Sequence, residues 1–268
     1  MTHRSINFSH IAHEPTLDVI QGTRDNLTNK EIEGVSTSLT SGVEKCVWHH
    51  DDVFSYVVNG NIIPNIVSDS ANDTASGTGA RTVKITGLLH QLVSGQNTFT
   101  RTSVTATLNG TTNVSGFGNF YRVEKLEVLT AGSSGLNQGN IKVFSQGTTN
   151  VVASMSAGDN VSNQLILSPA DNEDALVERI HVSGYFQTPV ELKINVYEQS
   201  TGLQKTIYKF FCSSNSNNFT FNIRKKLVSG DTLWASLKPI TAVTGLHNSI
   251  SVLCEATLKN KNSVVPTF

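Results

Sequence analysis

The chain has 268 residues and carries 20 Lys and Arg against 21 Asp and Glu, so its net charge is close to zero. A chain with so little net charge does not bind a polyanion through bulk charge, and we expect no nucleic-acid partner. Charged residues make up 15% of the chain and hydrophobic residues 38%. The apolar residues are mostly Val, Ile, Leu and Phe in short clusters, which indicates a folded, strand-rich protein rather than a disordered one.

The chain has no run of 18 apolar residues, and its first thirty residues lack the basic start and apolar stretch of a secretory signal. We therefore expect neither a membrane span nor a signal peptide. Cys46, Cys212 and Cys254 stand far apart and form no Cys-x-x-Cys pair. This spacing predicts neither a disulfide framework nor a zinc site, and it fits synthesis in a reducing compartment.

Residues 1–45 are polar and lack sustained periodicity. We interpret them as an extended N-terminal arm, because the segment has too little apolar surface to offset the entropy of ordering it alone. Two alternatives stay open: a disordered terminus, and an arm that becomes ordered on a neighbouring subunit. The second would use the apolar side chains spaced along the segment, which are Ile6, Phe8, Ile11, Leu17, Val19 and Ile20.

A cluster of imidazole and carboxylate groups follows Trp48, and such groups together suit zinc, iron or manganese. In an extended stretch neighbouring residues point to opposite faces. Only His49 with Asp51, or His50 with Asp52, can therefore bind one ion. A solvated loop is the interpretation that we favour, and we expect no bound metal and no cofactor.

From about residue 80 onward, apolar and polar residues alternate in short runs bounded by Gly, Asn and Ser. In the clearest run, residues 190–197, Val190, Leu192, Ile194 and Val196 share one face, and the same alternation turns Cys254 inward. Further strands are expected at residues 81–86, 103–108, 121–128, 140–144, 164–168, 219–223, 232–237 and 249–256.

No apolar stripe of helical period spans three turns beyond residue 45, which argues against a parallel α/β fold. The sequence predicts an all-β fold of antiparallel β-sandwiches, with two jelly-roll-like domains in tandem after the N-terminal arm. We place the first domain at residues 46–157 and the second at residues 158–268.

Two loops carry residues that also occur in ligand sites. Residues 77–81 read Gly-Thr-Gly-Ala-Arg, but a strand follows them, whereas a phosphate loop needs a helix N-terminus there. Asp171, Glu173 and Asp174 offer oxygen ligands for Ca²⁺, but no Gly-hinged loop accompanies them, and a solvated turn is the favoured interpretation. The chain has no Gly-x-Ser-x-Gly motif, and we expect no enzymatic activity.

Arg224, Lys225 and Lys226 form a basic triplet. Three charges without interleaved aromatic residues fall short of a nucleic-acid surface. We interpret the triplet as a feature of an edge strand or of a contact between subunits, because charges on edge strands block unwanted pairing.

Aromatic residues supply the other candidates for an interface. Trp234 lies opposite the inward face of its strand, so either another element covers it or it is exposed at an interface. Tyr185 and Phe186, close to Pro189, belong either to the core or to an interface. We count these three with the basic triplet as candidate contact residues.

Three turn motifs follow one another in the first half of the chain: Gly-Thr-Gly-Ala-Arg at residues 77–81, Leu-Asn-Gly-Thr-Thr at 108–112, and a Gly-rich turn at 132–141 that ends in Asn-Ile. This ordered set resembles a pattern in virion structural proteins of large DNA viruses and tailed bacteriophages. The likeness covers about half of the chain and extends through residues 228–239 and 250–258. Residues 121–128 lack the small polar spacing of that pattern, and residues 1–45 match no part of it.

The resemblance implies a capsid-associated role in the virion, after synthesis in the host cytoplasm. It suggests a minor capsid, vertex or decoration protein whose partners are further copies of itself, as a trimer or pentamer, and other capsid proteins. The alternative is a fibre or attachment module that binds a host glycan, because β-sandwich loops bearing Asn and aromatic residues are suited to sugars.

Overall fold

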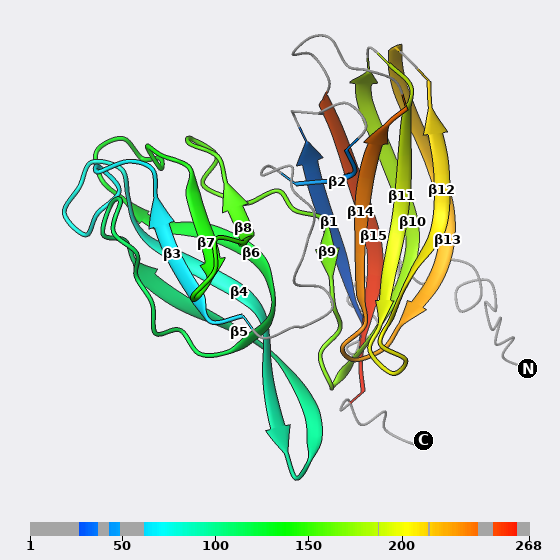
Figure 1. Cartoon of the computed structure of the whole chain (residues 1–268), viewed down its shortest axis with the longest axis horizontal. Coiled ribbons are helices and arrows are strands. Elements are labelled where there is room, and N and C mark those ends of the chain that lie inside the picture. Colours follow the sequence, from blue (N-terminus) through cyan, green and yellow to red (C-terminus); the bar gives the residue numbers. More distant parts are fainter. Residues whose placement is uncertain are drawn as a thin grey trace, which may run out of the picture.

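A computed structural model of the chain describes residues 27–36, 43–48, 62–186, 188–213, 215–240 and 249–261. Within these ranges the chain forms strands β1 to β15 and no helix (Figure 1). All paired strands run antiparallel, which confirms the predicted all-β class. Among the described residues there is no helix of the length and apolarity needed to cross a bilayer.

The first sandwich consists of two three-stranded sheets with the orders β5-β4-β6 and β3-β7-β8. Its strands are β3 (Pro64–Ser68), β4 (Ala80–Val93), β5 (Gln96–Thr107), β6 (Phe120–Ala131), β7 (Ile141–Ser145) and β8 (Val151–Met155). Side chains from both sheets meet in one core, in which the fully buried members include Ile66, Val83, Ile85, Leu126 and Val143. The β4–β5 hairpin projects beyond the rest of this sandwich (Figure 1).

The second sandwich has one sheet in the order β1-β15-β10-β13 and another in the order β12-β11-β14-β2, with β9 also paired to β14. Its strands are β1 (Leu27–Ser36), β2 (Lys45–Cys46), β9 (Ile166–Leu167), β10 (Glu173–Phe186), β11 (Val190–Glu198), β12 (Leu203–Cys212), β13 (Asn215–Leu227), β14 (Thr232–Pro239) and β15 (Ser249–Asn260).

The predicted alternation sets the core of this second sandwich. Val190, Leu192 and Ile194 are fully buried on the inner face of β11. Cys254 is buried opposite Ile180 of β10 and Ile32 of β1. The residues that sequence periodicity assigns to the interior of these two strands therefore form the interior.

The expectation of an arm over residues 1–45 is wrong for residues 27–36. These ten residues form β1, which pairs with β15 of the same chain from Leu27 opposite Lys259 to Ser36 opposite Ile250. The segment has its own short alternation, with Ile32, Gly34 and Ser36 buried, but its partner strand lies more than 200 residues away, so local composition concealed it. Residues 1–26 lie outside the described ranges.

β2 also belongs to the second sandwich, where Cys46 lies opposite Ser236 of β14. Strands β1 and β2 thus join the sheets formed by β9 to β15, while β3 to β8 form the other two sheets. The domain bounds of 46–157 and 158–268 stay a prediction, with β1 and β2 counted in the second unit.

The three turn motifs of the first half meet around Asp73, which is fully buried. Its carboxylate accepts hydrogen bonds from the amides of Ala80 at 2.7 Å, Gln138 at 2.9 Å and Gly139 at 2.9 Å. Its backbone carbonyl accepts the amide of Gly110 at 2.8 Å. One residue from the loop before β4 therefore joins all three motifs, although 65 residues separate it from Gln138.

We expect Asp73→Ala to lower the free energy of unfolding by about 3 kcal/mol or more, because several buried amides lose their acceptor. Asp69→Ala is the matched control, since Asp69 is exposed and pairs with Lys142 at the surface. Its effect should stay below about 1 kcal/mol. Urea denaturation of both variants measures the difference, and equal effects would show that Asp73 does not organise these loops.

Cys46, Cys212 and Cys254 are all buried and form no disulfide with one another. Burial raises the pKa of Cys212 to about 11 and the pKa of Cys254 to about 12, so little reactive thiolate exists near neutral pH. We expect a thiol reagent at about pH 8 to label the native protein much more slowly than the protein unfolded in urea. Fast labelling of the native chain, or an observed disulfide, would contradict this burial.

Candidate functional site

The first five residues of β6 form the seam between the two sandwiches. All five, from Phe120 to Glu124, are buried, whereas a strand with one solvated face would alternate. Phe120 and Val123 belong to the core of the first sandwich. Tyr121, Arg122 and Glu124 carry polar groups that contact residues of the second, as the hydrogen bonds below show.

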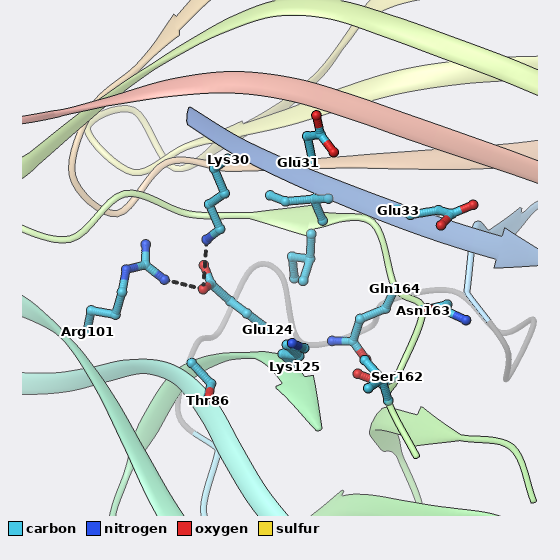
Figure 2. A pocket seen from close by; sticks show the side chains of 13 residues that line it. Lys30, Glu31, Glu33, Thr86, Arg101, Glu124, Lys125, Ser162, Asn163 and Gln164 are labelled. Carbon is cyan, nitrogen blue, oxygen red and sulfur yellow. Dashed lines mark hydrogen bonds and ion pairs between the residues drawn. The ribbon is translucent and has the colours of Figure 1, made fainter. Parts of the chain in front are cut away.

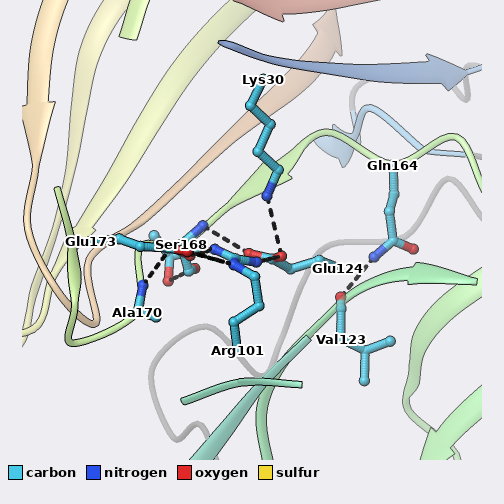
Figure 3. A network of polar contacts seen from close by, with 9 residues as sticks. Lys30, Arg101, Val123, Glu124, Gln164, Ser168, Ala170 and Glu173 are labelled. Carbon is cyan, nitrogen blue, oxygen red and sulfur yellow. Dashed lines mark hydrogen bonds and ion pairs between the residues drawn. The ribbon is translucent and has the colours of Figure 1, made fainter. Parts of the chain in front are cut away.

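A cluster of charged side chains lies at the centre of this seam (Figure 3). The guanidinium of Arg101, on β5, donates to the Glu124 carboxylate and, through Nε and Nη2, to the Glu173 carboxylate at 3.1 and 2.8 Å. Arg101 also donates to the carbonyl of Ser168 at 2.8 Å. Lys30 of β1 approaches Glu124 to 3.4 Å. Arg101 and Glu124 therefore come from the first sandwich, and Lys30 and Glu173 from the second.

Backbone amides also donate to both carboxylates, from Ser168 to Glu124 Oε1 at 3.2 Å and from Ala170 to Glu173 Oε2 at 3.0 Å. Burial alone would lower the pKa of Arg101, but the charge of Glu124 and the bonds to Glu173 outweigh it and raise that pKa. Burial would likewise raise the pKa of Glu173, but the bonds from Arg101 and the Ala170 amide lower it. Both groups are therefore held in their charged forms.

Tyr121 and Arg122 form a second layer of contacts across the seam. The Tyr121 hydroxyl oxygen lies 2.8 Å from the carbonyl oxygen of Gly230 and 2.7 Å from Gln199 Oε1, and the two acceptors share its one proton. Burial raises the pKa of Tyr121 to about 12, so the hydroxyl stays a donor. Arg122 is fully buried, lies 3.8 Å from the centre of the Tyr121 ring and donates to Thr232 at 2.9 Å.

The acidic stretch after Pro169 is part of the same interface. Asp171 accepts the amide of Phe99 at 2.8 Å and the hydroxyl of Ser229, and Phe99 packs against Tyr121 with ring centres 4.5 Å apart. Asp174 binds Lys226 and Lys261, each at 3.0 Å. These carboxylates contact protein donors, and no cluster of three metal-ligating side chains occurs in the described part of the chain.

Trp234 lies in the apolar part of the seam. Its side chain is 6% exposed and belongs to the same core cluster as Ile62, Phe120 and Ile166. Of the two alternatives raised by the sequence, coverage by another element is therefore the one that holds. The interpretation of Trp234 as an exposed contact with another subunit is therefore wrong, because its side chain is buried between the two sandwiches.

A cleft of about 390 Å³ opens beside the charged cluster (Figure 2). It is lined by Lys30 to Glu33 of β1, by Thr86, Arg101, Glu124 and Lys125 of the first sandwich, and by residues 161–164 and Ile166. The Gln164 side chain donates to the carbonyl of Val123 at 2.8 Å, while its buried Oε1 has no hydrogen-bond partner. The lining holds paired acidic and basic side chains together with Ser, Thr, Asn and Gln.

The other candidate contact residues lie on β10 and β13, two paired strands of the second sandwich. Tyr185, near the end of β10, is 47% exposed. Arg224, Lys225 and Lys226 lie on β13, the edge strand next to β10. Lys225 pairs with Glu198 at 3.5 Å and Lys226 pairs with Asp174, while Arg224 adopts a positive φ of 49° where the β10–β13 register shifts.

Phe186 ends β10, but its side chain lies outside the described part of the structure, as do His49, His50, Asp51 and Asp52. The structure thus brings none of the predicted contact residues into the charged cluster except through the Lys226–Asp174 pair at its margin. Contact of Tyr185, Phe186 and the basic triplet with another subunit stays a prediction.

Sequence reasoning missed Arg101, Glu124 and Tyr121, because each looks like an ordinary strand residue. Their partners lie 23 to 109 residues away, beyond the reach of any local pattern. One signal was available: residues 120–124 read Phe-Tyr-Arg-Val-Glu, which fails to alternate cleanly and so indicates a strand covered on both faces.

Comparison with protein-family models finds no match, and comparison with curated protein sequences finds none either. Among solved structures, that of the infectious bursal disease virus Gx strain aligns with 90% of this chain and 74% of its own, at 8% identity and a TM-score of 0.23. The VP2 subviral particle of the same virus aligns with 89% of this chain and 73% of its own, at 7% identity and a TM-score of 0.22. The similarity is weak and identifies no family.

We expect Arg101→Met to lower the free energy of unfolding by about 3 kcal/mol, because the variant leaves the buried carboxylate of Glu124 and the partly buried carboxylate of Glu173 without their guanidinium partner. Lys30→Met is the matched control, since Lys30 is about as exposed as Arg101 but makes a single contact to the same Glu124 carboxylate, at the longer distance of 3.4 Å. Its effect should stay below about 1 kcal/mol. Chemical denaturation measures both, and equal effects would contradict the central role of Arg101.

The cluster also predicts a pH dependence. The pKa of Glu173 is lower in the folded chain than its ordinary value of 4.5, so this carboxylate adds stability that is fully present above that pH and is lost as the pH falls through the folded-state pKa. Arg101→Met removes two of the bonds that lower the pKa. The variant should therefore lose less stability than the wild type between about pH 6 and pH 3, as measured by urea titrations at each pH. Parallel acid curves for the two proteins would contradict this linkage.

Proposed function

We propose that the chain is a structural subunit of a viral capsid, as a minor capsid, vertex or decoration protein, and that it acts by contact rather than by catalysis. Its partners are further copies of itself, in a closed trimer or pentamer, and other capsid proteins of the virion. The proposal includes no cofactor.

The observation that carries the proposal is the partly buried charged cluster of Arg101, Glu124 and Glu173 between the two sandwiches. A buried ion pair adds little net stability compared with apolar packing, but its directional bonds favour one geometry of the groups that it joins. Here the groups belong to two separate sheet systems. A subunit that repeats the same contacts many times in a closed shell needs such a fixed angle between its parts.

The three motifs that resemble those of virion proteins give a second support. They meet around Asp73, so the likeness falls on residues that build one structural feature rather than on scattered turns. A set of residues selected to hold loops in place is what a subunit with loop-based contacts requires.

A fibre or glycan-binding module is the second candidate, and one feature favours it. A polar cleft of about 290 Å³ lies on β11, β12 and β14, lined among others by Asn195, Gln204, Thr206 and Trp234. Amide, hydroxyl and aromatic groups are the kinds that bind sugars. Several of these side chains bond to one another, as Asn195 does to Ser236 and Thr206, which leaves fewer free groups for a ligand.

Light scattering of the purified chain at tens of micromolar tests the proposal, together with the copy number of the chain in isolated particles by mass spectrometry. We expect a closed oligomer, and a copy number per particle that is a simple multiple of the number of symmetry-equivalent positions in the particle. A monomer that is also absent from particles would contradict the proposal. Binding to a glycan array, without incorporation into a shell, would favour the attachment module.

A further inference from the structure

Strand β5 is an edge strand of its sheet, and its free edge carries little protection against pairing. It pairs with β4 in twelve consecutive positions, from Val93 opposite Gln96 to Thr82 opposite Thr107, without a register shift. The strand reads Gln-Asn-Thr-Phe-Thr-Arg-Thr-Ser-Val-Thr-Ala-Thr, with no proline and one charged residue. That residue is Arg101, which turns its guanidinium into the buried cluster.

Hydrogen bonds near the two ends of β5 show which of its backbone amides and carbonyls face β4 and which point away from it. The amide of Leu108 donates to Arg81 in the extension of β4, whereas the amide and carbonyl of Phe99 both bond to Asp171 on the other side. In an antiparallel pair successive residues alternate between the two sides. The amides and carbonyls of Arg101, Ser103, Thr105 and Thr107 therefore point away from β4.

No backbone hydrogen bond joins these four residues to another segment within the described ranges. Ser103, Thr105 and Thr107 are also exposed. The free edge spans seven residues, or about 23 Å of strand. An uncovered edge of this kind is a template for another strand.

The other long edge strands of the chain are protected. β1 carries Lys30, Glu31 and Glu33, β12 carries Lys205 and Lys209, and β13 carries the basic triplet together with a register shift. β6 is covered by the chain itself, since the amide of Val128 donates to Asn160. Charges and irregularities of this kind block pairing between edges, whereas β5 has no register shift and bears no charge from Ser103 to Thr107.

We propose that the free edge of β5 pairs with the same edge of a second copy of this chain, antiparallel and about a two-fold axis. Two copies of one edge can approach without repulsion because the outward-facing stretch from Ser103 to Thr107 bears no charge. An identical antiparallel strand is self-complementary under two-fold symmetry. The register that uses all four outward residues of both copies places Ser103 opposite the second copy's Thr105.

The contact continues the β5-β4-β6 sheet across two molecules and so gives the proposed capsid subunit one defined neighbour. It rests on the proposed function only in requiring that copies of the chain meet. A contact of this length is small by the standard of stable interfaces, so we expect weak pairing that gains strength from repetition in a shell.

Thr105→Glu tests the edge. The new carboxylate lies across from Lys84 within the monomer, so the fold tolerates it, but it places a charge on the pairing surface. We expect the dimer dissociation constant from sedimentation equilibrium to rise at least about tenfold, with an unchanged thermal midpoint. Thr28→Glu, at an exposed site on the β1 edge, is the matched control and should leave the constant unchanged.

Crosslinking tests the geometry. Ser103→Cys chains mixed with Thr105→Cys chains should form a disulfide-linked dimer under mild oxidation, while the native cysteines are buried and do not compete. A disulfide-linked dimer of either variant alone would show that the two copies pair through this edge in a different register. No crosslink above that of a Thr28→Cys control, or a dimer dissociation constant that Thr105→Glu leaves unchanged, would overturn the proposal. If Thr105→Glu chains assemble normally into particles, the β5 contact is contradicted but the proposed capsid function is not.

Discussion

The arrangement of the two sandwiches depends on one partly buried cation. Arg101 extends from β5 and is held by Glu124 of its own sandwich and Glu173 of the other. Each carboxylate is completed by a backbone amide, from Ser168 and Ala170. A rotation of one sandwich against the other would break these hydrogen bonds and leave polar groups unpaired, which is unfavourable. The cluster therefore tolerates little change in the angle between the sandwiches. Tyr121 and Arg122 extend the same constraint along β6.

Apolar packing alone would not fix this angle so tightly. Trp234 and Ile166 share a core cluster with residues of the first sandwich, and such contacts tolerate small rotations better than directional hydrogen bonds do. The seam combines both kinds of contact, apolar at Trp234 and polar at Arg101. The combination suits a protein whose work is to present surfaces in a constant relation.

The sequence predicted the class of fold because strand alternation is a local property. Val190 and Cys254 face inward as expected, since each lies in a run with a period of two. The assignment of β1 failed because its ten residues become a strand only through β15, more than 200 residues later. The charged cluster could not be predicted for the same reason: Arg101 and Glu173 are 72 residues apart, and neither stands in a local motif.

The position of charged side chains differs between strand edges that face solvent and edges that face the other sandwich. Where a sheet ends against solvent, at β12 and β13, charged side chains lie on the strand and oppose pairing. Where a sheet ends against the other sandwich, the charges turn inward and join the two, as Arg101 does. β5 combines the two situations: its one charged side chain points into the seam, and its outer edge bears no other charge. The cation that holds the two sandwiches together thus also leaves β5 open to a further strand.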